Sequence, residues 1–196
     1  MIKKLFITLI FFAVLCAAAV WYVYSIKFES DEAVRLYIPG NSTEQSIKDT
    51  LCSNLGEKYG EWVYRFWTID KGNPNRSTGS YVIKPETSAL NAARTISRSW
   101  QTPVRVTLNN MRTIDDLTKQ LSSKLAANSE EFLHAIKNDT TYSNTRQYTA
   151  AFIPDTYEFY WTASPESVIG KLIDIRNNFW NEERIAKARK LNLTPT

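Results

Sequence analysis

One stretch of this chain concentrates rings and carboxylates: Phe152-Ile153-Pro154-Asp155-Thr156-Tyr157-Glu158-Phe159-Tyr160-Trp161. Its five rings break the alternation that an ordinary half-buried strand would show. Pro154 fixes its own φ and pushes Ile153 toward extended geometry. Asp155 and Thr156 follow as a turn or cap pair, because both side chains can accept bonds from nearby backbone N–H groups. The sequence therefore predicts an extended approach, a tight corner at Pro154-Asp155 and an aromatic floor.

This aromatic run has two interpretations. Sugar C–H faces stack on aromatic rings while carboxylates bind sugar hydroxyls, so the run has the composition of a carbohydrate site. The same composition also suits an aromatic-rich corner of a hydrophobic core. Composition alone leaves both interpretations open.

The whole chain excludes several classes of function. Its 196 residues carry a formal charge of +4 without a Lys/Arg block, which argues against nucleic acid. Cys16 lies within the apolar segment near the N-terminus and Cys52 lies outside it, so we expect no disulfide between them. His134 is the single histidine, so the sequence has no zinc-ligand spacing. No glycine-rich phosphate loop and no nucleophile elbow occurs in the sequence. We expect neither a metal nor a cofactor.

An apolar segment at 5–26 opens the chain. It is long enough for a transmembrane helix, and Lys3 and Lys4 before it favour an inside N-terminus. We therefore expect a cytoplasmic tip at 1–4, a single-pass anchor in the inner membrane and a linker at 27–33. The bulk of the chain would lie on the periplasmic, extracytoplasmic side. The alternative is a signal peptide cleaved after the alanines at 17–19.

The remainder predicts an α+β fold, because a strand, a short turn and an amphipathic helix recur three times. The first two copies enclose a helical segment at 57–67 and predict a β-α-α-β module at 34–100. Ser42 and Gln45 predict a capping box for its first helix. The predicted core of this module is Leu36, Ile38, Ile47, Leu51, Tyr81, Ile83, Ala93 and Ile96.

A second domain is predicted at 103–196. Val104-Arg105-Val106-Thr107-Leu108 alternates as a half-exposed strand and precedes two helices. Ser164 and Pro165 then open a final helix as N-cap and first residue, with an apolar pattern that fades near Asn192. We expect a mixed α/β domain that is incomplete, with apolar surface left without a partner.

Several motifs in this order resemble the membrane-anchored endolytic murein transglycosylases, the YceG-like family. The run matches the family signature F-x-P-[DN]-T-Y-x-[FW]. The other matches are Tyr37-Ile38-Pro39-Gly40, Gly79-Ser80-Tyr81-Val82-Ile83, Gln101-Thr102-Pro103-Val104-Arg105-Val106-Thr107, and Arg112-Thr113 followed by Asp116-Leu117. The resemblance implies a LysM-like module at 34–100. It also implies a lytic transglycosylase that cleaves nascent peptidoglycan strands to 1,6-anhydromuramic acid ends.

The resemblance also implies roles for residues of the run. Asp155 and Tyr157 would position or contact substrate, while Asp155 has the alternative role of a turn cap. The other expected cleft residues are Pro154, Thr156 and Phe159. The family's catalytic glutamate lies in a segment like A-S-I-[IV]-x-x-E, which is not among these 196 residues. No catalytic residue can therefore be assigned, and we expect this N-terminal portion to be inactive alone.

Glycan strands, the lipid bilayer and proteins of cell-wall synthesis are the expected partners. The alternative to an enzyme is a non-catalytic, membrane-tethered module that binds glycan or serves as a scaffold for cell-wall synthesis. For the LysM-like module itself, glycan binding and simple packing both remain open.

Overall fold

The fold is described from a computed structural model, which covers residues 2–109, 111–138 and 152–193. The chain divides into two compact units, Met1–Thr102 and Pro103–Thr196. Each unit contains one antiparallel pair of strands with helices packed against it. The α+β class expected from the sequence is confirmed.

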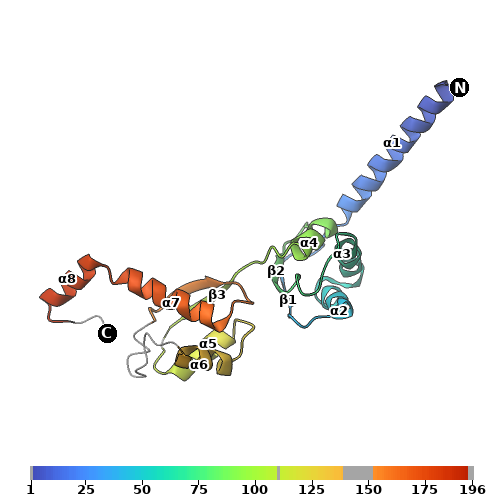
Figure 1. Cartoon of the computed structure of the whole chain (residues 1–196). Helices are drawn as coiled ribbons and strands as arrows, with labels where there is room; N and C mark the ends of the chain where they lie inside the picture. The colour runs from blue at the N-terminus through green and yellow to red at the C-terminus, as the bar shows by residue number, and fades with distance from the viewer. Residues whose placement is uncertain (1, 110, 139–151, 194–196) are drawn as a thin grey trace. The chain divides into compact units, whose positions relative to one another are not determined.

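The first unit is built around the antiparallel pair β1 (Val34–Ile38) and β2 (Gly79–Ile83). Two helices connect these strands, α2 (Glu44–Leu55) and α3 (Glu57–Ile69), and α4 (Ala89–Ser97) follows β2. In Figure 1 the three helices gather around the strand pair. The order β-α-α-β is therefore the one that the sequence pattern predicted.

The helix starts in this unit follow local side-chain chemistry. Thr43 is the N-cap of α2, where its hydroxyl accepts the Ser46 N–H at 3.2 Å and the Ser46 hydroxyl accepts the Thr43 N–H at 2.9 Å. The capping box predicted at Ser42 and Gln45 was wrong by one residue, because two neighbouring hydroxyls compete for the cap. Ser88 caps α4 through the Asn91 N–H.

A single hydrophobic core holds the first unit together. All eight residues that the sequence placed in this core are buried: Leu36, Ile38, Ile47, Leu51, Tyr81, Ile83, Ala93 and Ile96. Trp67 is also buried, and its indole N–H donates to the Ser77 hydroxyl at 2.9 Å. Each large side chain buried in this way stabilises the fold by roughly 1.5–3 kcal/mol.

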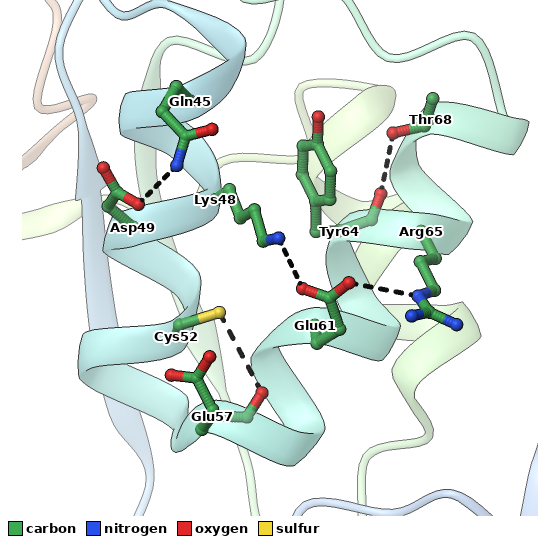
Figure 2. A network of polar contacts seen from close by, with 9 residues as sticks. All are labelled: Gln45, Lys48, Asp49, Cys52, Glu57, Glu61, Tyr64, Arg65 and Thr68. Atoms are coloured by element: carbon green, nitrogen blue, oxygen red, sulfur yellow. Dashed lines mark hydrogen bonds and ion pairs between the residues drawn. The ribbon is translucent and has the colours of Figure 1, made fainter.

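Helices α2 and α3 approach each other closely at Gly60. A Cβ atom at this position would lie 2.6 Å from the Cα of Cys52 on α2. A polar network spans the same two helices (Figure 2), in which the Lys48 ammonium lies 2.9 Å from the Glu61 carboxylate. Arg65 donates to the other Glu61 oxygen at 3.1 Å, one helical turn away. Glu61 therefore joins the two helices on the outer side of their contact.

The helix α1 (Ile2–Ser25) ends against the first unit. The Tyr22 ring meets the Trp62 ring edge-on at 6.1 Å, and Val23 and Ile26 pack on the core. Tyr22 near the C-terminal end of this helix thus contacts protein, whereas Trp21 beside it is 74% exposed. Within the described residues no helix combines the length and apolarity needed to cross a membrane, so the transmembrane helix predicted at 5–26 is contradicted.

The segment at 27–33, expected as a linker, also packs on the module. Phe28 is buried in its core, and the Phe28 N–H donates to the carbonyl of Thr87 at 2.9 Å. The Glu86 N–H donates to the Phe28 carbonyl at 3.0 Å. Lys27 forms an isolated bridge with Ser88 next to these bonds. The beginning of this segment therefore adds a short extended contact to the loop before α4.

The second unit pairs β3 (Val104–Leu108) with β4 (Asp155–Phe159) in an antiparallel arrangement. Its helices are α5 (Ile114–Ser122), α6 (Ser129–Asn138), α7 (Pro165–Phe179) and α8 (Glu182–Lys190). Residues from both strands and from α5, α6 and α7 share one buried cluster. The expected final helix is two helices, because Asn181 caps a new one through the Arg184 N–H at 3.0 Å.

Replacement of Gly60 by Ala tests the close approach of α2 and α3. We expect a loss of roughly 1–3 kcal/mol in the free energy of unfolding of the first unit, because the added methyl group meets backbone atoms of α2. Gly170→Ala in α7 is the matched control, since its Cβ would meet no atom within 4 Å. Helix propensity should make that control about 0.5–1 kcal/mol more stable. Calorimetry measures both, and equal shifts for the two variants would contradict the close contact.

The Glu61 network predicts a dependence of stability on pH. Hydrogen bonds from Lys48 and Arg65 hold the pKa of the Glu61 carboxyl below its ordinary value. The stabilisation is therefore present above the ordinary glutamate pKa and is lost as pH falls through the lowered one. We expect Glu61→Gln to reduce the difference in melting temperature between pH 7 and pH 3, relative to the native chain. The exposed Glu32→Gln is the control, and an unchanged pH dependence in Glu61→Gln would contradict the role of the network.

Candidate functional site

The aromatic run forms β4 and the turns on either side of it. Within β4 the side chains of Tyr157 and Phe159 are buried, while Glu158 is exposed. The alternation of a half-buried strand is therefore kept at these positions, contrary to the first expectation from the five rings. The alternation continues to Tyr160, which is exposed and follows the end of β4, and the Tyr160 carbonyl accepts a turn bond from the Ala163 N–H at 3.0 Å.

The corner before β4 is held by Tyr157. Its hydroxyl donates to the carbonyl of Ile153 at 2.5 Å, across the proline. Burial, with a smaller contribution from the Asp155 charge, raises the pKa of the Tyr157 hydroxyl, so this donor stays protonated at neutral pH. The Asp155 carboxylate accepts the Thr156 N–H at 2.6 Å. The predicted corner at Pro154-Asp155 is therefore present, and Asp155 makes the capping contact that was one of its two interpretations.

Antiparallel pairing brings β3 alongside β4 in a defined register. Arg105 lies opposite Glu158, and Thr107 lies opposite Thr156. These four side chains point to the side of the sheet away from the core, and we call them the polar sheet face. The Thr107 and Thr156 hydroxyls are 2.9 Å apart. Arg105 Nε lies 3.9 Å from Glu158 Oε1, and both side chains are mostly exposed.

The side chains on the opposite face of the same strands pack in the hydrophobic core. Val104, Val106 and Leu108 alternate with the polar residues of β3 and lie in the buried cluster of the second unit. Tyr157 and Phe159 join them from β4, with their ring centroids 6.3 Å apart. These two rings serve the core, so any contact of theirs with substrate stays a prediction. Pro154, Asp155 and Thr156 remain reachable from solvent.

Lys171 of α7 secures the remaining part of β4. Its ammonium donates to the carbonyl of Glu158 at 2.9 Å and lies 5.0 Å from the centre of the Phe159 ring. The Lys171 charge is thus occupied by backbone and ring. Arg105 is the cation that the polar sheet face presents to solvent among the described residues.

The described residues offer little other chemistry. They contain no group of three or more His, Cys, Asp or Glu side chains that could hold a metal ion. Burial raises the pKa of the Cys52 thiol, which lowers its reactivity. The His134 ring lies on α6 within 3.1 Å of the Asn138 amide. A pocket of about 410 Å³ opens beside His134 and a pocket of about 420 Å³ beside Tyr59, and residues 154–159 line neither.

Sequence reasoning missed the two residues that β3 contributes to this face. The alternation of 104–108 predicted a half-exposed strand, which the structure confirms, and it marked Arg105 and Thr107 as the exposed positions. Nothing in the local pattern showed that this strand pairs with 155–159, which is about fifty residues further along the chain. The sequence therefore predicted that Arg105 and Thr107 are exposed, but it did not predict that they lie beside Thr156 and Glu158.

Comparison with known proteins agrees with the order of motifs along the chain. The model of the YceG-like family matches residues 36–196, which run from within β1 to beyond α8. The chain belongs to the YceG-like family. A search of curated proteins found no match. A crystal structure of a YceG-like protein from Listeria monocytogenes is similar with 14% identity and a TM-score of 0.43, over 85% of this chain. The matched part spans 61% of the length of that protein.

Replacement of Tyr157 by Phe tests the corner that positions Asp155 and Thr156. We expect a loss of about 0.5–1.5 kcal/mol in the free energy of unfolding of the second unit, because the Ile153 carbonyl loses its donor. Tyr160→Phe is the matched control, since that side chain is exposed. Urea denaturation measures both variants. A Tyr157→Phe variant as stable as the Tyr160→Phe variant would show that the hydroxyl does not hold the corner.

Proposed function

We propose that this chain engages peptidoglycan as part of an endolytic lytic transglycosylase, which cleaves nascent glycan strands and leaves 1,6-anhydromuramic acid ends. The observation that carries the proposal is family membership over residues 36–196, because that range includes both the module and the aromatic run. The structural comparison adds no weight to it. The polar sheet face gives the proposal a concrete surface, with hydroxyls and charges suited to a hydroxyl-rich polymer.

The reaction requires a carboxyl group that first donates and then accepts a proton. Such a group first protonates the glycosidic oxygen and then takes the proton of the 6-hydroxyl that attacks the anomeric carbon. It needs a partly apolar site that raises its pKa. Asp155 and Glu158 are both exposed, so neither lies in such an apolar site, and the Asp155 carboxylate is engaged with the Thr156 N–H. We therefore assign Asp155 to positioning and neither residue to proton transfer.

The proposal places the globular units where their substrate is made. Nascent glycan strands are polymerised on the outer side of the inner membrane, so the two units would work in the periplasmic, extracytoplasmic space. The partners are the glycan strands themselves and the proteins that polymerise them. The bulk charge of +4 favours approach to the anionic wall polymer.

A second candidate function is a non-catalytic glycan-binding or scaffold module of cell-wall synthesis. One observation favours it: no described carboxylate on the polar sheet face lies in an apolar pocket. The β-α-α-β order of the first unit is also the shape expected of a LysM-like glycan-binding module. This function requires no cleavage of glycan, so a test for cleaved glycosidic bonds distinguishes the two candidate functions.

A cleavage and binding assay tests the proposed function. Uncrosslinked glycan strands are incubated with the full chain, and bound strands and 1,6-anhydro ends are quantified by sedimentation and mass spectrometry. We expect binding without cleavage, because neither Asp155 nor Glu158 suits proton transfer, and a site without that transfer forfeits roughly 10²–10⁴-fold from that step alone. Fusion to the C-terminal part of a YceG-like relative should restore cleavage.

Three outcomes of this assay would overturn parts of the account. A chain that binds no glycan would contradict both the enzyme and the glycan-binding module. A fusion that binds but never cleaves would favour the scaffold function over the enzyme. Cleavage by the 196 residues alone that disappears in Asp155→Asn would show that Asp155 is the acid, contrary to its assignment here.

A further inference from the structure

The inference starts from the incomplete pairing of Arg105. Its side chain is 75% exposed, and Arg105 Nε lies 3.9 Å from Glu158 Oε1, which is itself 65% exposed. A distance of 3.9 Å exceeds that of a charge-assisted hydrogen bond. The guanidinium therefore keeps N–H donors available to a ligand, and the β3–β4 register fixes the place of Arg105 on the sheet.

The surroundings of Arg105 define the ligand that would fit. Further along the same face the Thr107 and Thr156 hydroxyls form a pair that can both donate and accept. Arg105 and this hydroxyl pair therefore follow one another along one face of the strand pair. A matching ligand carries a carboxylate close to a set of sugar hydroxyls.

We infer that Arg105 recognises a carboxylate of the peptide stem on the glycan strand and so selects stem-bearing strands over bare glycan. This inference rests on the proposed function and names the specificity of the same surface. Peptidoglycan fits the pattern, because stem peptides with free carboxylates branch from a chain of sugar hydroxyls. Arginine suits this task, since its planar fork binds a carboxylate through two parallel N–H···O bonds.

Replacement of Glu158 distinguishes a binding role of Arg105 from a purely structural one. Its carboxylate competes with the stem carboxylate for Arg105 and repels it as a like charge. Removal of Glu158 should therefore strengthen stem binding, whereas removal of Arg105 should weaken it. A pair that serves only to stabilise the sheet predicts the opposite behaviour, in which both removals act in the same direction.

The experiment compares two glycan ligands on the full chain. One is uncrosslinked strands with stem peptides, and the other is the same strands after an amidase has removed the stems. The variants are Arg105→Gln, Arg105→Lys and Glu158→Gln, each checked for an unchanged melting temperature. We expect Arg105→Gln to weaken binding of stem-bearing strands about 1.5- to fivefold, as the loss of one exposed ion pair does, and to leave bare strands unaffected. Glu158→Gln should tighten stem binding, and Arg105→Lys should restore part of the loss.

The outcomes separate this inference from the proposed function. Native chain that binds both ligands equally, with variants that do the same, would overturn the role of Arg105 and leave glycan binding intact. Native chain that binds neither ligand would overturn the proposed function together with this inference. Weakening of stem binding by Glu158→Gln would show that the pair is structural, which also overturns the inference.

Discussion

The antiparallel register of β3 with β4 is the constraint on which the second unit depends. It brings two segments about fifty residues apart into contact and fixes which side chain lies opposite which. One face of the pair then supplies Val106 and Tyr157 to the core, and the other presents Arg105, Thr107, Thr156 and Glu158. A slip of one residue would exchange these faces, burying charges and exposing rings, so packing and polar surface are specified together.

Local signals in the sequence predicted much of this fold. The helix start at Ser164 and the alternation of 104–108 depend on neighbouring residues, and the structure has them where expected. The buried residues of the first unit were predicted from helical and strand periodicity, which also depends on residues close together in the sequence. The missed features are of a different kind. The N-cap of α2 is Thr43 and the N-cap of α8 is Asn181. Each lies near other side chains that could also cap a helix, so the sequence does not show which one forms the cap.

The candidate site was harder to predict than the fold because it depends on contacts distant in sequence. The run at 152–161 was found from composition, but Tyr157 and Phe159 lie in the core, while Arg105 and Thr107 join the site only through strand pairing. The membrane helix predicted at 5–26 rested on the length and apolarity of that segment, and the described residues contain no helix that combines the two as a membrane span requires.

The central claim is that the polar sheet face meets the glycan strand, and chemical-shift mapping tests it most directly. An isotope-labelled chain would be titrated with uncrosslinked glycan strands, and amide shifts followed for each residue. The account predicts the largest changes at Arg105, Thr107, Thr156 and Glu158, with the helices behind the sheet little affected. Changes confined to the first unit, with none at these four residues, would contradict it.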